Sequence, residues 1–342
     1  MARTYLITGG AGFIGANLCA QLRRREPEAR LVIVDDFRSG SYATLVEVFA
    51  AAGAGPFAGQ VIAESTAEID LAMLCEAHDP AAVFHLAAIT DTTVRDQRVM
   101  IRDNTEGFED LIRACHEARR PLVYASSAAT YGSPPQGFQR VPFPEDAAGA
   151  PNNVYGFSKW LMECVHRKLD EELAEDGDRP WVVGLRYFNV FGPGEAAKGS
   201  MSSMPYQLAR QMLDGRRPRI FTDGQQARDQ VSVHDVVGCT MAAAGLGERP
   251  NPEPGVYNLG SGRATSFNEI VAALREALDI SEQRLPTEYF EMPAHIAEHY
   301  QEYTCADMRA AEAGLGWRPE HEPRAAIMAY GRYLAEQHGR AG

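Results

Sequence analysis

The segment TYLITGGAGFIGANL, residues 4–18, decides the fold, because a short apolar run leads through a glycine cluster into a helical pattern. Gly10, Gly12 and Gly15 fit the spacing Gly-x-Gly-x-x-Gly, and Gly9 begins a wider form of the same spacing. Glycines at these positions permit a tight turn and bring a pyrophosphate close to free amide groups at a helix N-terminus. The segment therefore predicts a strand, a turn and a helix that bind a dinucleotide.

Asp35 lies at the end of the next apolar run, where a carboxylate is placed to bind the ribose of such a cofactor. The negative charges of Asp35 and Asp36 repel a 2′-phosphate and therefore favour NAD over NADP. Arg38 carries the positive charge that a 2′-phosphate requires, so NADP stays open as the alternative.

Short apolar runs alternate with helical stretches along the rest of the chain. The runs are TYLIT, LVIV, VFHLAA, LVYASS, VVGLRYF and VYNLG, and they are apolar nearly throughout, as strands covered on both faces are. This alternation predicts an α/β fold with a doubly wound parallel Rossmann sheet. The pattern loosens near residue 195, which predicts a smaller C-terminal region over the mouth of the sheet. We place the Rossmann domain at residues 1–194 plus about 229–261, and the smaller domain at residues 195–228 plus about 262–342.

The composition excludes several classes of function. With 46 acidic and 33 basic residues among 342, the net charge is −13, which argues against a nucleic-acid partner. No apolar run approaches the length of a membrane span, and the N-terminus lacks the layout of a signal peptide. The six cysteines are scattered without a Cys-x-x-Cys pair and predict buried thiols in a reducing compartment. We therefore expect a cytoplasmic protein with no membrane partner.

Residues 152–173, NNVYGFSKWLMECVHRKLDEEL, predict a helix that carries catalytic groups. An i, i+4 series of apolar residues predicts its buried stripe: Phe157, Leu161, Val165, Leu169 and Leu173. Tyr155 and Lys159 are also four residues apart and share another face. A phenol with a pKa of about 10 is a poor base, and a neighbouring ammonium lowers that pKa toward the working range. Ser127, at the end of LVYASS, is placed to bind the reacting oxygen.

Together these motifs resemble those of the extended short-chain dehydrogenase/reductase superfamily. The shared features are the glycine turn, Asp35, the run HLAA, Asn104 in RDNTEGF, Ser127 and Tyr155-x-x-x-Lys159. The resemblance covers nearly the whole chain and implies a Rossmann domain that binds NAD(P) and a smaller C-terminal α/β domain that binds a nucleotide sugar. It implies the following cofactor-binding residues: Gly9, Gly12, Phe13, Ile14, Gly15, Asp35, Asp36, Arg38, Leu86, Ala87, Ala88, Asn104, Lys159 and Val190.

Two longer segments narrow the resemblance. Residues 185–221, LRYFNVFGPGEAAKGSMSSMPYQLARQMLDGRRPRIF, and residues 292–308, MPAHIAEHYQEYTCADM, are closely similar to segments of ADP-L-glycero-D-manno-heptose 6-epimerases. This similarity implies that Lys198 is a second acid/base, and that Ser127, Tyr155 and Lys159 complete the catalytic set. It also implies a nucleotide-sugar site made of Asn189, Ser200, Gln207, Phe221, Arg228 and Tyr300.

Two acid/base groups suit an inversion at carbon 6 of a heptose. Hydride leaves one face of that carbon and must return to the other, so the 6-keto intermediate has to turn. Because carbon 6 is exocyclic, its carbonyl can flip without the ring, and its oxygen then meets a second base. The expected reaction interconverts ADP-D-glycero-D-manno-heptose and ADP-L-glycero-D-manno-heptose with a tightly bound, recycled NAD(P).

Other functions stay open. Gly194, Gln207 and Gln230 depart from the epimerase pattern, so the substrate could be another nucleotide sugar, such as a GDP-heptose. A 4-epimerase or a reductase is a further alternative, and an inactive NAD(P)-sensing protein is the last. A 4,6-dehydratase is disfavoured, because SSAATYG lacks the acid that those enzymes place after the serine.

Two further expectations concern metal binding and the oligomeric state. His295 and His299 are four residues apart but have no third ligand at a useful spacing, so we expect no metal. Relatives in the superfamily assemble through surface helices, and the resemblance therefore implies a homo-oligomer.

Overall fold

The computed structural model describes residues 2–91, 94, 96–133, 140–174, 179–293 and 300–341. Its larger part is a parallel sheet of seven strands in the order β10-β6-β5-β4-β1-β2-β3, which confirms the doubly wound α/β fold. The strands are β1 (Thr4–Thr8), β2 (Arg30–Val34), β3 (Gln60–Ile62), β4 (Ala82–His85), β5 (Leu122–Ser127), β6 (Val182–Tyr187) and β10 (Gly255–Leu259). All six apolar runs form strands of this sheet. β3 was missed, because it is a three-residue edge strand that is only half covered.

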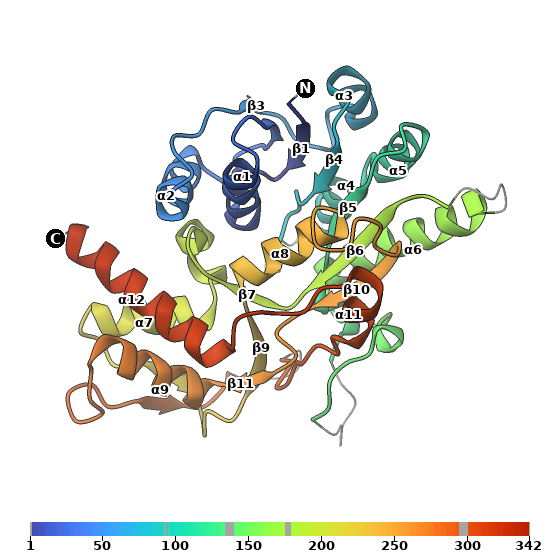
Figure 1. Ribbon diagram of the computed structural model, residues 1–342. Coiled ribbons are helices and arrows are strands. Elements are labelled where there is room, and N and C mark those ends of the chain that lie inside the picture. Colours follow the sequence, from blue (N-terminus) through green and yellow to red (C-terminus); the bar gives the residue numbers. More distant parts are fainter. Residues whose placement is uncertain are drawn as a thin grey trace.

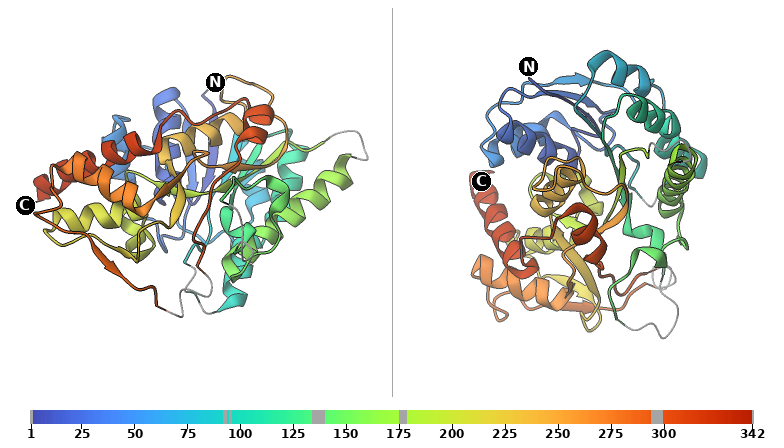
Figure 2. Two further views of the ribbon diagram at one scale, coloured as in Figure 1. Left: turned by 90° about the horizontal axis from the view of Figure 1, so that it is seen from below. Right: turned by 45° about the vertical axis from the view of Figure 1, so that its right-hand side comes forward.

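Both faces of the sheet are covered by helices, and successive residues of one strand serve opposite faces. In β1, Tyr5 and Ile7 join one buried cluster and Leu6 joins the other. The first face carries α1 (Phe13–Arg25), α2 (Tyr42–Ala52), α8 (Val233–Ala243) and α11 (Arg309–Leu315). The second carries α3 (Leu71–His78), α5 (Phe108–Glu117) and α6 (Val154–Ala174), and α4 (Gln97–Thr105) packs on α6. Figure 2 shows the two helical layers on opposite sides of the sheet.

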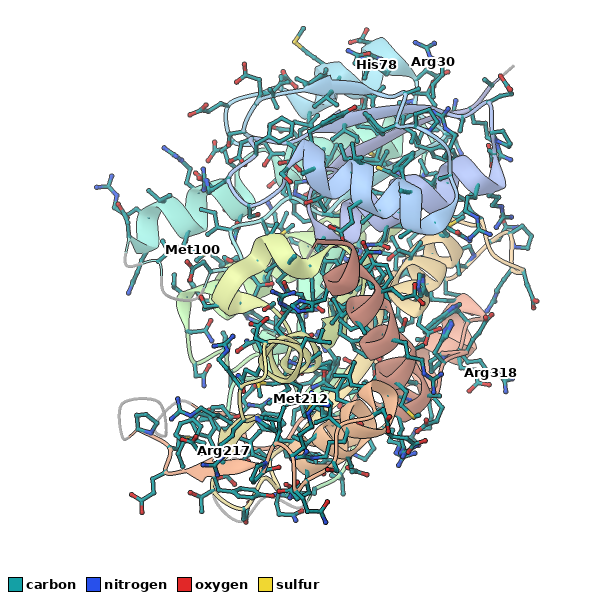
Figure 3. All side chains as sticks on the ribbon, turned by 90° about the vertical axis from the view of Figure 1, so that its left-hand side faces the viewer. Arg30, His78, Met100, Met212, Arg217 and Arg318 are labelled. Carbon is teal, nitrogen blue, oxygen red and sulfur yellow. The ribbon has the colours of Figure 1, made fainter. Side chains whose placement is uncertain are left out.

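A smaller body lies at the carboxyl ends of the strands, below the Rossmann part in Figure 1. It contains α7 (Met204–Leu213), β8 (Arg219–Phe221), α9 (Phe267–Leu278), β12 (Glu288–Phe290) and α12 (Pro323–Ala341). A three-stranded sheet of β11 (Ala264–Ser266), β9 (Ala227–Ser232) and β7 (Asn189–Phe191) leads into it from the Rossmann sheet. Its apolar cluster is separate from the two clusters of the large sheet. In Figure 3, Arg30 and His78 mark the Rossmann end, and Met212 and Arg217 mark the smaller body.

Helix α6 forms as predicted, and its apolar stripe is partly buried: Leu169 is fully buried, and Val165 and Leu173 pack against the second cluster. Phe157, at the start of the stripe, is 42% exposed. The buried residues of the helix are Gly156, Ser158, Lys159, Met162, Glu163, His166 and Leu169, so its buried face carries more polar groups than the stripe predicts. Polar groups occupy this face because partners on the sheet satisfy them: Glu163 accepts hydrogen bonds from Ser126 at 2.6 Å and from two nitrogens of Arg186 at 2.9 and 2.7 Å. Cys164 on this helix is exposed, contrary to the expectation for the cysteines, and the other five are buried.

Two helices reach the length of a membrane span. α6 has 21 residues and α12 has 19, but charged side chains interrupt both. Within the described ranges, no helix is both long and apolar enough to cross a bilayer.

Candidate active site

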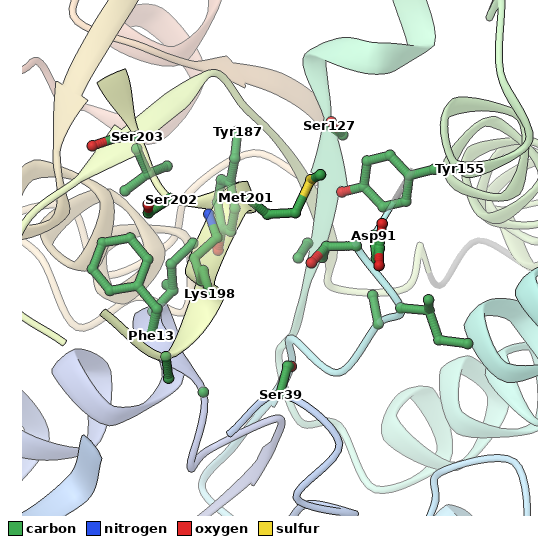
Figure 4. Close-up of a pocket in the computed structure, with 18 of the residues that line it drawn as sticks. Phe13, Ser39, Asp91, Ser127, Tyr155, Tyr187, Lys198, Met201, Ser202 and Ser203 are labelled. Carbon is green, nitrogen blue, oxygen red and sulfur yellow. The ribbon is translucent and has the colours of Figure 1, made fainter. Parts of the chain in front are cut away.

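A cavity of about 960 Å³ lies between the carboxyl ends of the Rossmann strands and the smaller body. This is where open α/β sheets bind ligands, and the volume suits a large organic ligand. Every expected site residue except Asn104 lines this one cavity. Figure 4 shows Tyr155 and Ser127 on one side of the hollow and Lys198 with Phe13 on the other.

The glycine turn has the geometry that a pyrophosphate requires. Gly9 has φ +67°, and a Cβ on it would lie 2.7 Å from the amide nitrogen of Ala87. A Cβ on Gly15 would lie 2.1 Å from the carbonyl oxygen of Gly9, so helix α1 approaches β1 only with glycine there. Gly12 is the N-cap of α1 and supplies no side-chain cap, which leaves the first amides of the helix free. The residues present therefore fit a dinucleotide, with its diphosphate over these amides.

Asp35 braces the turn from the end of β2. Its carboxylate is 7% exposed and accepts hydrogen bonds from the amides of Ala11 and Phe37, each at 2.9 Å. Burial raises the pKa of Asp35, and these amide hydrogen bonds act in the opposite direction. The expected ribose contact and the brace are compatible, because a carboxylate accepts several hydrogen bonds at once.

Asn104 lies behind the cavity wall and is not one of its lining residues. Its side chain accepts from the amide of Ile89 at 2.7 Å and donates to the carbonyl of Ile89 at 3.1 Å. It also donates to the hydroxyl of Ser158 at 2.9 Å, beside Lys159 in α6. The arrangement ties the segment after β4 to the catalytic helix, which supports the site without touching a ligand.

Tyr155 and Ser127 lie together at the end of β5. Asn153 starts α6 by accepting from the amide of Gly156 at 2.8 Å, which places Tyr155 in the first turn. The Ser127 hydroxyl hydrogen-bonds the Tyr155 phenol and lowers its pKa, but burial has the larger effect and raises it. This direction is opposite to the one expected from the sequence. The reason is the burial of the phenol itself; burial also lowers the pKa of the neighbouring Lys159, to about 7.

Lys198 reaches the cavity from η3 (Glu195–Met201), a short helix between β7 and α7. Its ammonium lies 5.6 Å from the centre of the Phe13 ring, on the first turn of α1. Burial lowers the pKa of Lys198, while the nearby Glu195 raises it. The small neighbours Ala196, Ala197 and Gly199 leave this lysine as the reactive group of the segment.

Glu195, which sequence reasoning did not select, holds this segment in place. Its carboxylate is fully buried and accepts from the amide of Gly192 at 3.1 Å and the amide of Ser203 at 2.6 Å. The hydroxyl of Ser203 adds a third hydrogen bond at 2.9 Å. One carboxylate therefore closes the loop around Lys198, since it binds residues before and after it.

The far wall of the cavity carries polar groups without partners. Arg228 Nη1 and Gln230 Oε1 are buried and have no hydrogen-bond partner among the described residues. The Arg228 guanidinium lies 4.7 Å from the centre of the Tyr300 ring, and Tyr300 packs edge-on against Phe221. Gln230 was noted only as a departure from the family pattern. Its position two residues after Arg228 on β9 was the available signal, because alternate strand residues share a face.

Gln207 differs from the other expected substrate residues. It lines the cavity, but its amide nitrogen donates to the carbonyls of Ser200 at 3.2 Å and Ser202 at 2.7 Å. Its amide nitrogen therefore holds the loop that carries Lys198. No group of three or more metal-ligating side chains occurs in the part of the chain that the structure describes, and His295 and His299 lie outside that part.

Comparison with known proteins agrees with this geometry. The model of the NAD dependent epimerase/dehydratase family matches residues 5–260. The chain belongs to this family. The enzyme class and the NAD dependence expected from the sequence are thereby confirmed, and the Rossmann sheet supplies the corresponding fold.

Individual relatives are similar along nearly their whole length. The chain is 37% identical over 325 residues to ADP-L-glycero-D-manno-heptose-6-epimerase of Alkalilimnicola ehrlichii, covering 91% of this chain and 92% of that one. Among solved structures, the Helicobacter pylori ADP-L-glycero-D-manno-heptose-6-epimerase has a TM-score of 0.80 at 31% identity, with 97% and 96% of the chains covered. The UDP-glucuronic acid 4-epimerase of Bacillus cereus, solved with UDP-glucuronic acid and NAD, has a TM-score of 0.75 at 25% identity, with 98% and 99% covered.

Proposed function

We propose that this family member interconverts ADP-D-glycero-D-manno-heptose and ADP-L-glycero-D-manno-heptose by inverting carbon 6. The observation that carries the proposal is the pair of acid/base candidates, Tyr155 and Lys198, on opposite sides of one cavity. The heptose is supported by the 37% identity to a relative with that activity, and by the 31% identity to a solved one.

Each base serves one orientation of the carbon 6 oxygen. When bound, NAD accepts a hydride from the substrate and returns it, so no reductant is consumed. As the alcohol is oxidised, one of the two residues takes the hydroxyl proton. After the carbonyl has flipped, the other residue gives a proton to the oxygen while the opposite face is reduced. The pKa of Lys198 is lowered by burial, which increases the neutral fraction that can accept a proton.

Tyr155 acts with Ser127 in this scheme. The Ser127 hydroxyl shares a hydrogen bond with the phenol and is placed to bind the same substrate oxygen. Because burial keeps the Tyr155 phenol protonated, Tyr155 is suited to donate its proton in the reduction step. Lys198 is then suited to accept one in the oxidation step of that direction, and the two roles exchange in the reverse reaction.

Arg228 is the group that we assign to the diphosphate of the substrate. Its guanidinium can pair two phosphate oxygens at once, and its buried Nη1 has no partner among the described residues. Gln230 lies on the same wall, and its free Oε1 can accept a hydrogen bond from a sugar hydroxyl.

Proton NMR of the purified protein with ADP-D-glycero-D-manno-heptose tests the reaction. The L-glycero epimer should form without added NAD(P), and in D₂O carbon 6 should gain no deuterium, because the same hydride returns. Consumption of NAD(P)H with substrate would indicate the alternative of a reductase. Bound cofactor without any turnover would leave the alternative of a sensor, provided that other nucleotide sugars are also inert.

A substrate panel addresses the alternative sugars. The resemblance to the heptose epimerases implies an aromatic residue where this chain has Gln230, and this departure favours testing GDP-heptose beside ADP-heptose. UDP-glucose tests a 4-epimerase. Faster turnover of GDP-heptose would replace the nucleotide in the proposal and keep the roles of Tyr155 and Lys198, whereas faster turnover of UDP-glucose would remove the role of Lys198 at an exocyclic carbon.

We also propose that the protein is a homo-oligomer. Relatives in the superfamily assemble through surface helices, and Phe157 on α6 is 42% exposed, so it offers an apolar side chain to such a contact. Light scattering should give a mass above that of one chain. Phe157→Glu should lower it if this helix forms the contact.

A further inference from the structure

Polar side chains form a row on one face of the small sheet of β7, β9 and β11. Asn189 of β7 is the register partner of Gln230 of β9. Arg228 lies two residues before Gln230 on the same strand. Paired positions, and alternate positions of one strand, lie on the same face of a sheet. All three residues line the cavity, so this face is one wall of the site.

The amide of Gln230 is buried and has an unused acceptor. The residue is 1% exposed, and its Oε1 has no hydrogen-bond partner among the described residues. Buried polar atoms without a partner are rare, because leaving one unpaired costs free energy of folding. On the same wall, Nη1 of Arg228 is a donor that is also buried and unpartnered. The wall therefore offers a donor and an acceptor to one ligand, from positions about 7 Å apart along β9.

The neighbours of these two residues indicate which part of a nucleotide sugar each one meets. The Arg228 guanidinium lies 4.7 Å from the centre of the Tyr300 ring. An aromatic ring suits the flat base of the nucleotide, and the diphosphate then lies next to it, at Arg228. Gln230 is paired with Asn189 in the segment directly after β6, and the last residue of β6 is the register partner of Ser127. This link to the reacting centre favours the sugar as the partner of the Gln230 amide.

We propose that Gln230 is a specificity-determining residue that accepts a hydrogen bond from the sugar hydroxyl beside the anomeric carbon. The diphosphate is attached to that carbon, so this hydroxyl is the sugar hydroxyl nearest to the group that Arg228 binds. The role rests on the proposed nucleotide-sugar epimerase and adds one requirement for its substrate, a hydroxyl at carbon 2. A sugar without it leaves Oε1 of Gln230 buried and unpaired, and its transition state should be bound more weakly.

Competition between ADP-D-glycero-D-manno-heptose and its 2-deoxy analogue tests this role, with both epimerisations followed by proton NMR at carbon 6. Wild type should prefer the natural substrate in kcat/KM by about 10-fold to 100-fold, the value of one buried acceptor left unpaired. Gln230→Met keeps the length of the side chain and removes the amide, so the preference should fall to about twofold. Turnover of the 2-deoxy analogue should stay close to wild type, which also verifies that the variant is folded.

Gln226→Met is the matched control. Gln226 Oε1 is also buried without a partner in the described part of the chain, but Gln226 is not among the residues that line the cavity. The control variant should keep the full preference, and an equal fall in both variants would overturn the role of Gln230. So would an unchanged preference in Gln230→Met, or an equal loss with both substrates, which would make Gln230 a structural residue.

Two further measurements distinguish the sugar from the nucleotide, and the role of Gln230 from the reaction itself. A substrate analogue with 2′-deoxyribose reports on the nucleotide, and a preference that Gln230→Met abolishes there instead would overturn the assignment to the sugar. Calorimetric titration of the NAD-loaded Tyr155→Phe variant compares binding of the heptose and its 2-deoxy analogue without turnover. A binding ratio that depends on Gln230, in a protein that does not epimerise, would overturn only the proposed reaction. A ratio independent of Gln230 in an active epimerase would overturn only the role of Gln230.

Discussion

Tyr155 and Lys198 reach the same cavity but are held by different kinds of structure. Tyr155 lies in the first turn of α6, a helix of 21 residues packed on the large sheet. Lys198 lies in η3, seven residues that contain a non-helical glycine, and depends on the single buried carboxylate of Glu195. A regular element therefore positions one base, and a cross-linked loop positions the other. The two should respond differently to substitution.

Removing either base should have the largest effect on activity, and the two variants should show whether each base has its own role. Tyr155→Phe and Lys198→Ala should each lower the epimerisation rate by about 10²-fold to 10⁴-fold, the usual value of general acid/base catalysis. The absorbance of the reduced cofactor should show which epimer each variant can still oxidise. If each base serves one orientation, each variant should still exchange hydride with one of the two epimers, and the two variants should differ in which one. Loss of exchange with the same epimer in both would mean that they act on one orientation in series.

Substitutions in the contacts that hold α6 and Tyr155 should lower the free energy of unfolding more than substitutions in the Lys198 loop. Glu163→Gln leaves Arg186, which is 2% exposed, beside a neutral group and should cost about 3 kcal/mol of unfolding free energy in urea. Glu109→Gln, which breaks an exposed ion pair on α5, should stay close to wild type. Equal losses of unfolding free energy in the two variants would mean that the buried ion pair stabilises the packing of α6 no more than an exposed ion pair does.

A substitution in the Lys198 loop should instead lower kcat strongly and stability only slightly. Glu195→Gln replaces one acceptor oxygen by an NH₂ donor, so either the hydrogen bond from the Ser203 amide or those from the Gly192 amide and the Ser203 hydroxyl are lost, and Lys198 should lose its position. We expect about tenfold lower kcat with less than about 2 kcal/mol of lost stability, because the loop lies outside the two clusters of the sheet. A stability loss as large as that of Glu163→Gln, with normal kcat, would contradict this assignment.

The last prediction concerns pH and Lys159. Burial lowers the folded pKa of Lys159 to about 7, whereas the unfolded chain has its ordinary value of about 10.5. Between these values the unfolded state binds the proton and the folded state does not, so this lysine makes the unfolding free energy rise with pH. The slope is at most about 1.4 kcal/mol per pH unit. Urea titrations from neutral to alkaline pH should give a flatter dependence for Lys159→Met, and equal slopes would place Lys159 outside the buried core.

Local signals in the sequence were enough to predict most of the strands and the cofactor turn of the Rossmann half. The glycine turn, the strands on both sides of it and the four-residue spacing of Tyr155 and Lys159 each express a short-range rule of backbone sterics or helical period. These features predicted the strands of the sheet except β3, and all the expected cofactor residues except Asn104 line the cavity. The assignment of Lys198 required the resemblance to a family, because no local rule distinguishes one loop lysine from another.

Tertiary structure decided the rest. Which face of α6 is buried depends on Arg186 and Ser126, which reach Glu163 from two other strands. Arg38 is paired with Asp103, 65 residues away in the sequence. A periodic pattern reports the side of an element on which apolar groups lie, but it contains no information about the polar partner that another element brings to the same place. The sequence by itself therefore determined six strands of the large sheet, helix α6 and the cofactor turn, and only the folded chain decided which charges are paired and which remain available to a ligand.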